Sequence, residues 1–319
     1  MSLPASPSRL VIALRKSALS LCHAEYIRGR LLALYPSCEI VLRGITTQGD
    51  RIVDRSLAEV GGKGLFIEGI ESAITEGRAD FAVHSLKDMP MVVADGFVIA
   101  ATPAREDPRD ALVSSKYHSL AELPAGTIVG TSSPRREAQL LGRNAGLNIR
   151  LLRGNVNTRV QRLDEGNYDA VVLATAGLNR LGLGHRISAI LEPSEFLPAV
   201  GQGALALECS AERGDIIAAV EPLIDRSTLL AITAERAFAR ALSGSCYTPI
   251  AGHAIFRGDE LWLRGLLASR DGSEILRGEV ASPVADVAGA ESLGLALAQE
   301  FFVRGAARLL GEGSSVPVG

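Results

Sequence analysis

The chain has few aromatic residues, few cysteines and no long apolar run, and each shortage excludes a class of function. Aromatic residues make up 4% of its 319 residues, which argues against a stacking surface for single-stranded nucleic acid. The four cysteines form no Cys-x-x-Cys pair and have no histidine at metal-ligand spacing, so we expect neither a disulfide framework nor a metal site. No run is long enough for a signal peptide or a membrane span, so we expect a cytoplasmic protein without a membrane partner.

The charge balance is ordinary, but the cations are almost all arginine. The formal net charge is -3, with 47% hydrophobic and 22% charged residues, as in a globular protein. No global positive field recruits a nucleic acid, so any basic site has to be local. Only four of the 33 cationic residues are lysines: Lys16, Lys63, Lys87 and Lys116. A coding bias explains the excess of arginine but not the positions at which the arginines cluster.

Short apolar runs alternate with helical patterns from the N-terminus onward. Buried strands are predicted at 9–14, 38–45 and 79–85. Helices are predicted between them, at 17–34 and, after a break at GGKG, at 65–76. This β-α-β-α-β order is typical of a doubly wound, mostly parallel sheet.

A second series of the same kind begins after REDPRDALVS, residues 105–114. Its predicted strands are 127–130, 149–152 and 169–176. They lead into predicted helices at 131–144, 153–166 and 177–183. The strand-like segment 197–209 is compatible with a return to the first sheet, which would carry the chain twice between two domains.

The pattern changes again near residue 226. A helix is predicted at 228–242, a hairpin at 250–256 and 260–269, a third strand at 274–281 and a long helix at 291–310. We therefore expect an α/β chain of two doubly wound domains and a smaller α+β domain. The expected boundaries are 1–103 with 200–222, then 108–198, then 226–319.

Basic and hydroxyl side chains recur where the predicted strands end. The run Thr131-Ser132-Ser133 precedes Pro134 at a predicted helix start, which leaves N–H groups for an anion beside Arg135 and Arg136. Similar positions carry Arg15, Ser17, Arg153, Arg159 and Arg180. Each alone is compatible with a solvated surface. Ligands of doubly wound sheets bind beyond the carboxyl ends of the strands, so the recurrence predicts a cleft between the two domains for several carboxylates or phosphates.

Several common motifs are absent. The chain has no GxxxxGK[ST] loop, no GxGxxG after its first strand and no GxSxG elbow, so nucleotide, dinucleotide and serine-hydrolase sites are not indicated. His84 ends a predicted strand, where a lone histidine is more often structural than catalytic.

Lys87 and Asp88 follow the predicted strand at 79–85 and precede Pro90. They are compatible with a local ion pair that caps a turn. In an arginine-rich cleft, however, a carboxylate does not bind anions, so Asp88 is equally compatible with a role facing a donor or a developing positive charge.

Cys246 lies in the loop GSCYTP, whereas Cys22 and Cys209 lie in apolar runs typical of buried cysteine. A cysteine in such a loop is compatible with a structural role, a nucleophile or a covalent anchor.

Eight segments carry a resemblance to a known family. In chain order they are GGKGLF, VHSLKDMP, REDPRDALVS, GTSSPRR, LRGNVNTR, YDAVVLATAGLNRLGL, LPAVGQGAL and GSCYTPI. Together they resemble the porphobilinogen deaminase family over essentially the whole chain. The resemblance implies two domains similar to periplasmic binding proteins and a smaller α+β domain that carries the cysteine loop.

The resemblance also implies an activity and a cofactor. The family joins four porphobilinogen molecules head to tail with loss of ammonia and releases hydroxymethylbilane by hydrolysis, which is a transferase step of tetrapyrrole, porphyrin and heme biosynthesis. It uses a covalent dipyrromethane cofactor, and its usual state is a monomer. Each substrate carries an acetate and a propionate, which matches a ligand with many carboxylates.

Residue roles follow from matching motif positions. The catalytic aspartate falls on Asp88, which would bind pyrrole N–H groups and stabilise the azafulvenium cation, and the thioether to the cofactor falls on Cys246. Cofactor contacts are implied for Ser85, Lys87, Thr131, Ser132, Ser133, Arg135, Arg136 and Arg153, together with Asp88. Substrate contacts are implied for Arg15, Ser17, Lys63, Phe66, Arg153, Arg159, Arg180 and Gln202.

The chain departs from the family pattern in two segments. Ala18 and Ser20 stand where the family pattern has Pro and Ala, and Pro134 replaces an apolar residue, but none of these removes a side chain named above.

A non-catalytic polycarboxylate-binding protein of the periplasmic type explains a basic cleft but not Asp88 or Cys246. A cysteine-dependent amidohydrolase requires a histidine base, and only His253 is close to Cys246 in sequence.

Overall fold

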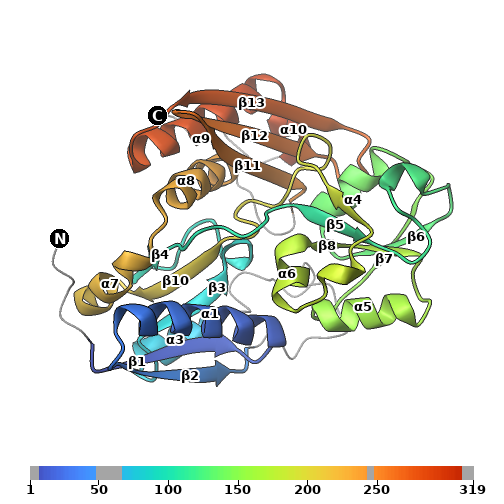
Figure 1. Ribbon diagram of the computed structural model, residues 1–319. Coiled ribbons are helices and arrows are strands. Elements are labelled where there is room, and N and C mark those ends of the chain that lie inside the picture. The colour runs from blue at the N-terminus through green and yellow to red at the C-terminus, as the bar shows by residue number, and fades with distance from the viewer. Residues whose placement is uncertain (1–6, 48–66, 243–247, 311–319) are drawn as a thin grey trace. The chain divides into compact units, whose positions relative to one another are not determined.

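The computed structural model describes residues 7–47, 67–242 and 248–310, and these residues form two compact units (Figure 1). Unit 1 consists of residues up to 105 together with 204–226, and unit 2 consists of residues 106–203 together with those from 227 onward. Each unit is described by itself. In the described part of the chain, no helix is both long and apolar enough to cross a membrane.

Unit 1 contains one five-stranded sheet in the order β2-β1-β3-β10-β4. Its strands are β1 (Arg9–Arg15), β2 (Glu39–Ile45), β3 (Phe81–Ser85), β4 (Phe97–Ala101) and β10 (Leu205–Ser210). Its helices are α1 (Ala18–Leu34), α3 (Glu68–Thr75) and α7 (Gly214–Val220), with short 3-10 turns at Leu86–Asp88 and Glu221–Leu223. The predicted strands and helices of this region are confirmed, and β4 was not predicted.

Helices cover both faces of this sheet. Ile27 and Leu31 of α1 pack with Ile12 of β1 in one core, to which α7 also contributes. Ile70 and Ile74 of α3 pack in another core on the opposite face. The sheet is mixed, because β10 runs antiparallel to both β3 and β4. This is the strand suggested by the segment 197–209, although it begins only at residue 205.

The first part of unit 2 contains a second five-stranded sheet in the order β7-β6-β8-β5-β9. Its strands are β5 (Asp110–Val113), β6 (Ile128–Thr131), β7 (Asn148–Leu151), β8 (Ala170–Ala174) and β9 (Ala189–Leu191). Its helices are α4 (Pro134–Leu141), α5 (Val156–Asp164) and α6 (Thr175–Arg180), with short 3-10 turns at Leu120–Glu122 and Gly184–Arg186. Leu140 of α4 packs on one face, and Val160 of α5 and Leu178 of α6 pack on the other. Strand β5 runs antiparallel to β8 and β9, and neither β5 nor β9 was predicted.

The last part of unit 2 is an antiparallel sheet, β11-β12-β13, with helices on one face. Its elements are α8 (Arg226–Ala241), β11 (Ile250–Arg257), β12 (Glu260–Ala268), β13 (Ile275–Pro283), α9 (Val287–Val303) and α10 (Ala306–Leu310). Phe238 of α8 and Phe301 of α9 meet edge to face with ring centroids 5.1 Å apart, and a Cβ on Gly265 would lie 2.5 Å from the Phe238 ring. The helices therefore press directly against the strands.

The single long helix predicted over 291–310 is wrong at its C-terminal end. The chain breaks into α9 and α10 at Arg304 and Gly305, where Gly305 has a φ of 91°. That left-handed conformation ends a helix at little cost for glycine. The predicted helical periodicity continues through the break, so it gave no sign of it.

Candidate active site

The predicted site residues of unit 1 that the structure describes lie at one edge of its sheet or directly after it. Strands β1 and β3 are parallel neighbours, with Ala13 opposite Ala82, so their carboxyl ends meet at the same edge. Arg15 ends β1, and Ser85 ends β3. Ser17 follows as the N-cap of α1, where its Oγ accepts a hydrogen bond from the Ser20 N–H at 3.2 Å. The predicted start of this helix is thereby confirmed.

Asp88 is held in place by its neighbours while its own side chain is exposed. The N–H of Leu86 donates to the carbonyl oxygen of Ala204 at 3.0 Å, and the N–H of Met89 donates to Leu86 at 3.1 Å. The side chains of Leu86 and Met89 are both buried, and Lys87 is half-buried. A backbone anchored on both sides therefore fixes the point from which the exposed Asp88 side chain extends.

His84 lies beneath this turn in a different environment. It is buried, and its Nε2 lies 3.0 Å from Oε2 of Glu208, which is fully buried on β10. The two atoms lie at ion-pair distance, although neither makes a hydrogen bond within the described chain. The arrangement supports the structural interpretation of His84.

In unit 2, the parallel strands β7, β6 and β8 also end at a common edge. The hydroxyl run that follows β6 begins α4 as predicted. The Ser133 N–H donates to Oγ1 of Thr131 at 3.1 Å, Oγ of Ser133 accepts from the Arg136 N–H at 3.4 Å, and Pro134 is the first helical residue. Thr131 is buried, whereas Ser132 is exposed.

The two arginines of α4 converge on one buried carboxylate, that of Asp110. Oδ2 of Asp110 accepts from Nη1 of Arg135 at 2.7 Å. Oδ1 accepts from Nε and Nη2 of Arg136 at 3.1 and 2.7 Å, and from Nε2 of Gln202 at 3.0 Å. Asp110 and Gln202 are fully buried, and both arginines are about 95% buried. The structure thus brings Arg135, Arg136 and Gln202 together, with many of their donors already bound inside the chain.

The electrostatics of this cluster favour the charged form of Asp110. Burial alone would raise the pKa of Asp110, but the charges and hydrogen bonds of Arg135 and Arg136 outweigh it, so the pKa lies well below its usual range. Burial lowers the pKa of Arg135, which nevertheless stays charged at neutral pH. The cluster therefore contains one negative and two positive charges, and its net charge is positive.

Asp110 was not among the predicted site residues. It is the first residue of β5, opposite Ala174 at the end of β8, because β5 runs antiparallel to its neighbour. The available signal was the acid directly before the buried run ALV in REDPRDALVS. Without the strand direction, that acid could not be placed at the same edge as the arginines.

The remaining predicted site arginines of unit 2, Arg153, Arg159 and Arg180, are half-buried. Nε of Arg159 donates to the carbonyl oxygen of Gly154 at 2.8 Å, and Nη2 of Arg180 donates to that of Gly203 at 3.2 Å. Arg153 follows β7 directly and precedes Asn155, the N-cap of α5. These guanidiniums are more accessible than those of Arg135 and Arg136.

The donor set fits a ligand that is rich in carboxylates. Among the described residues, Nε of Arg135 and Oγ1 of Thr175 are buried without a hydrogen-bond partner, and both belong to helices that start at the carboxyl edge of the sheet. A bound carboxylate is one kind of group that can supply acceptors for donors at this edge. Lys63, Phe66 and Cys246 lie outside the described residues. Within those residues, no group of three or more His, Cys, Asp or Glu could hold a metal.

Comparison with known proteins gives a consistent result. A family model described as "Porphobilinogen deaminase, dipyromethane cofactor binding domain" matches residues 10–218, and one described as "Porphobilinogen deaminase, C-terminal domain" matches residues 229–302. A porphobilinogen deaminase of Burkholderia thailandensis is 52% identical over 306 residues, covering 96% of this chain and 93% of that protein. One of Burkholderia pseudomallei is 52% identical over 294 residues, covering 92% and 89%.

Solved structures with similar chain traces are more distant. The methionine-binding protein MetQ matches with a TM-score of 0.44 and 14% identity, covering 70% of this chain and 93% of MetQ. The periplasmic aliphatic sulphonate binding protein SsuA from Escherichia coli matches with a TM-score of 0.41 and 15% identity, covering 94% and 88%.

Proposed function

The chain belongs to the porphobilinogen deaminase family, and from that premise we propose that it is a hydroxymethylbilane synthase. It joins four porphobilinogen molecules head to tail, releases ammonia at each addition and frees the linear tetrapyrrole by hydrolysis. The observation that carries this proposal is the match of both family models, which together span most of the chain from residue 10 to residue 302.

The cofactor of the family is dipyrromethane, and the chain's own residues fit it chemically. Cys246 would hold it through a thioether, and Ser85 and Lys87 would contact its acid side chains together with Thr131, Ser132, Ser133, Arg135, Arg136 and Arg153. When bound, it supplies the pyrrole end to which substrate is added. The unpartnered Nε of Arg135 and Oγ1 of Thr175 support this assignment, since carboxylates are the acceptors that both donors lack.

Asp88 would act on the reacting atoms. Its exposed carboxylate accepts hydrogen bonds from pyrrole N–H groups, and its negative charge stabilises the cation that the substrate becomes when ammonia departs. The anchored backbone at Leu86 and Met89 fixes the point from which the Asp88 side chain reaches the substrate.

Arginines would hold the acid side chains of the substrate. Arg15, Arg153, Arg159 and Arg180 are each half-buried, so part of each guanidinium can meet a carboxylate. Ser17, Lys63, Phe66 and Gln202 complete the proposed substrate contacts. We assign Arg135, Arg136 and Asp110 an additional part: the cluster keeps a net positive charge fixed beside the edge where the carboxylates bind.

Domain organisation and location belong to the same proposal. We propose three domains, a first of 1–103 with 200–222, a second of 108–198 and a third of 226–319, and the presence of three separate sheets supports this division. We further propose a cytoplasmic monomer that binds neither nucleic acid nor membrane.

A turnover experiment tests the proposal. Purified protein incubated with porphobilinogen should release one ammonia per substrate consumed and yield one linear tetrapyrrole per four substrates. A polycarboxylate-binding protein would bind substrate reversibly without consuming it. An amidohydrolase would release ammonia from amides and leave porphobilinogen unchanged.

A further inference from the structure

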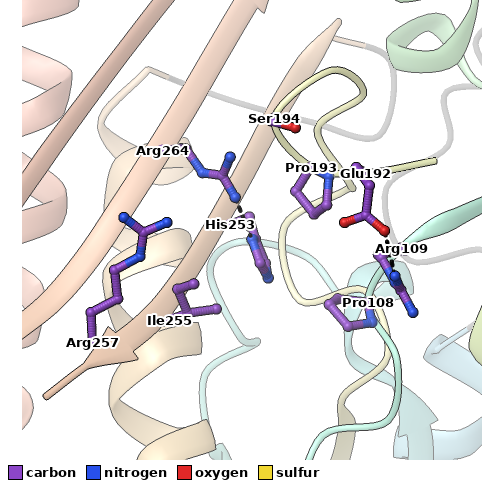
Figure 2. A pocket seen from close by; sticks show the side chains of 9 residues that line it. All are labelled: Pro108, Arg109, Glu192, Pro193, Ser194, His253, Ile255, Arg257 and Arg264. Carbon is purple, nitrogen blue, oxygen red and sulfur yellow. Dashed lines mark hydrogen bonds and ion pairs between the residues drawn. The ribbon is translucent and has the colours of Figure 1, made fainter.

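Unit 2 contains a pocket that none of the proposed site residues lines. It has a volume of about 440 Å³ and lies between the sheet β11-β12-β13 and two chain segments, one at Pro108 and Arg109 and one at Glu192, Pro193 and Ser194 (Figure 2). That volume is in the range of pockets for small organic molecules.

The strand period explains which side chains face this pocket. His253, Ile255 and Arg257 alternate along β11 and therefore share one face of the sheet. In the antiparallel register, Arg264 of β12 lies opposite His253, and Trp262 lies opposite Ile255. The other face packs on α8 and α9, so the basic residues are directed to the side where Figure 2 shows the pocket.

The guanidinium groups of Arg257 and Arg264 both lie over the indole ring of Trp262 at this face. The Cζ of Arg257 lies 3.4 Å from the centroid of the Trp262 ring, and that of Arg264 lies 4.3 Å from it. No described carboxylate forms an ion pair with either arginine, although Glu279 lies opposite Arg264 in the register. In the described chain, Nε of Arg264 is buried and donates to no acceptor.

The surroundings of Arg264 disfavour its positive charge. Burial lowers its pKa, and the like charge of Arg257 lowers it further, against a smaller opposing effect of Glu279. Its Nη2 lies 3.5 Å from Nδ1 of His253, a side chain that is 95% buried. An anion in the pocket would relieve the repulsion between the two guanidiniums.

The other residues that line the pocket limit the negative charge of that anion and favour an apolar body. Arg109 is already neutralised, since it binds Asp107 at 2.8 Å and Glu192 at 2.5 Å. Glu192 lines the pocket and repels a ligand with many negative charges. Pro108, Pro193 and Ile255 add apolar surface suited to an organic body.

We propose that the pocket between Arg257, Arg264 and Pro193 binds a small organic anion that carries one or two carboxylates on an apolar body. The two guanidiniums hold the carboxylates in bidentate contacts, and the proline and isoleucine side chains hold the body. This site adds to the proposed function and does not depend on it.

The chain's single tryptophan is Trp262, and its fluorescence reports on the two guanidiniums that lie over its ring and line the pocket. The probe is phthalate, titrated at constant ionic strength into the full chain, with dimethyl phthalate and inorganic phosphate as comparison ligands. A carboxylate that draws the guanidiniums from the ring should change Trp262 emission saturably. Arg257→Gln and Arg264→Gln should each weaken phthalate binding at least about 10-fold, because each removes a charge-assisted hydrogen-bonding group.

Arg308→Gln is the matched control, since Arg308 is an exposed arginine of the same unit that pairs with Glu274. It should bind phthalate as the wild type does. Arg257→Lys, which keeps the charge without the planar fork, should weaken binding less than Arg257→Gln. The proposal is overturned if emission does not saturate, if both glutamine variants bind normally, or if dimethyl phthalate or phosphate binds as tightly as phthalate.

Discussion

Oδ1 of Asp110 accepts hydrogen bonds from both Nε and Nη2 of Arg136, although the two residues are 26 positions apart in the chain. This contact ties the start of β5 to the first turn of α4. With Arg135 bound to the other carboxylate oxygen, three ionised groups occupy a space from which water is excluded. Such a cluster is costly to break, because removal of one member leaves the others buried and unpaired.

Asp110→Asn removes the negative charge from this cluster while it keeps the shape of the side chain. We expect it to lower the free energy of unfolding by about 3–5 kcal/mol, since two buried guanidiniums lose their counter-charge. Asp164→Asn is the control, because Asp164 pairs with Arg186 at an exposed position and should cost less than about 1 kcal/mol. Denaturant unfolding of both variants measures the difference, and equal small losses would show that the buried cluster contributes little.

The same residue predicts a pH dependence of stability. The pKa of Asp110 is lower in the folded chain than the usual value of about 3.9 expected after unfolding, so its contribution is complete above that value and is lost as pH falls toward the folded pKa. The stability difference between wild type and Asp110→Asn should therefore be constant above about pH 5. Below about pH 4 it should shrink by up to about 1.4 kcal/mol per pH unit.

Unfolding curves of both proteins from pH 7 to pH 3 test this dependence. A difference that stays constant down to pH 3 would contradict the assignment of a depressed pKa to Asp110.

Gly203 lies in the LPAVGQGAL motif with a φ of 88°, and a Cβ there would lie 2.3 Å from the carbonyl oxygen of Glu106. Gly203→Ala should destabilise the chain by at least about 3 kcal/mol, since the contact is with backbone that cannot rotate away. Gly166→Ala is matched in φ, at 79°, but meets nothing within 4 Å, so it should cost only about 1 kcal/mol. Thermal unfolding compares them, and similar losses would mean that the steric contact is relieved.

Asp88→Asn should remove turnover and leave stability nearly unchanged. The side chain is exposed, so the free energy of unfolding should change by less than about 0.5 kcal/mol. Loss of the charge that faces the developing cation should slow porphobilinogen consumption at least about 100-fold. Asp95→Asn, another exposed aspartate of unit 1, should keep wild-type turnover. A wild-type rate in Asp88→Asn would refute its role.

Much of the fold was predictable because local signals agree with the tertiary structure. The N-caps at Ser17 and Ser133 and the proline at the start of α4 are local chemistry, and the structure uses them as expected. Strand direction is not local. The short strands β5 and β9 have too few residues to show a period, and the antiparallel course of β5 depends on pairing with β8.

The site residues named from the sequence stay predictions, and the pairing of some of them with Asp110 had no signal in the sequence. Arg135 and Arg136 were expected beside a ligand, and the structure shows that both also bind Asp110. The pocket beside Arg257 and Arg264 left no sequence signal, because each arginine occupies its strand as an ordinary solvent-facing residue would. Only the register that places Arg264 opposite His253 reveals that the basic groups converge.

We propose that this chain carries a covalent dipyrromethane on Cys246, and the intact mass of the denatured protein is the decisive measurement. Protein from cells that make porphobilinogen should exceed the mass of the bare chain by two pyrrole units, and Cys246→Ser should show no such excess. Cys22→Ser, at a half-buried position on α1, should retain it. A wild-type chain of unmodified mass, or an excess that persists in Cys246→Ser, would contradict the account.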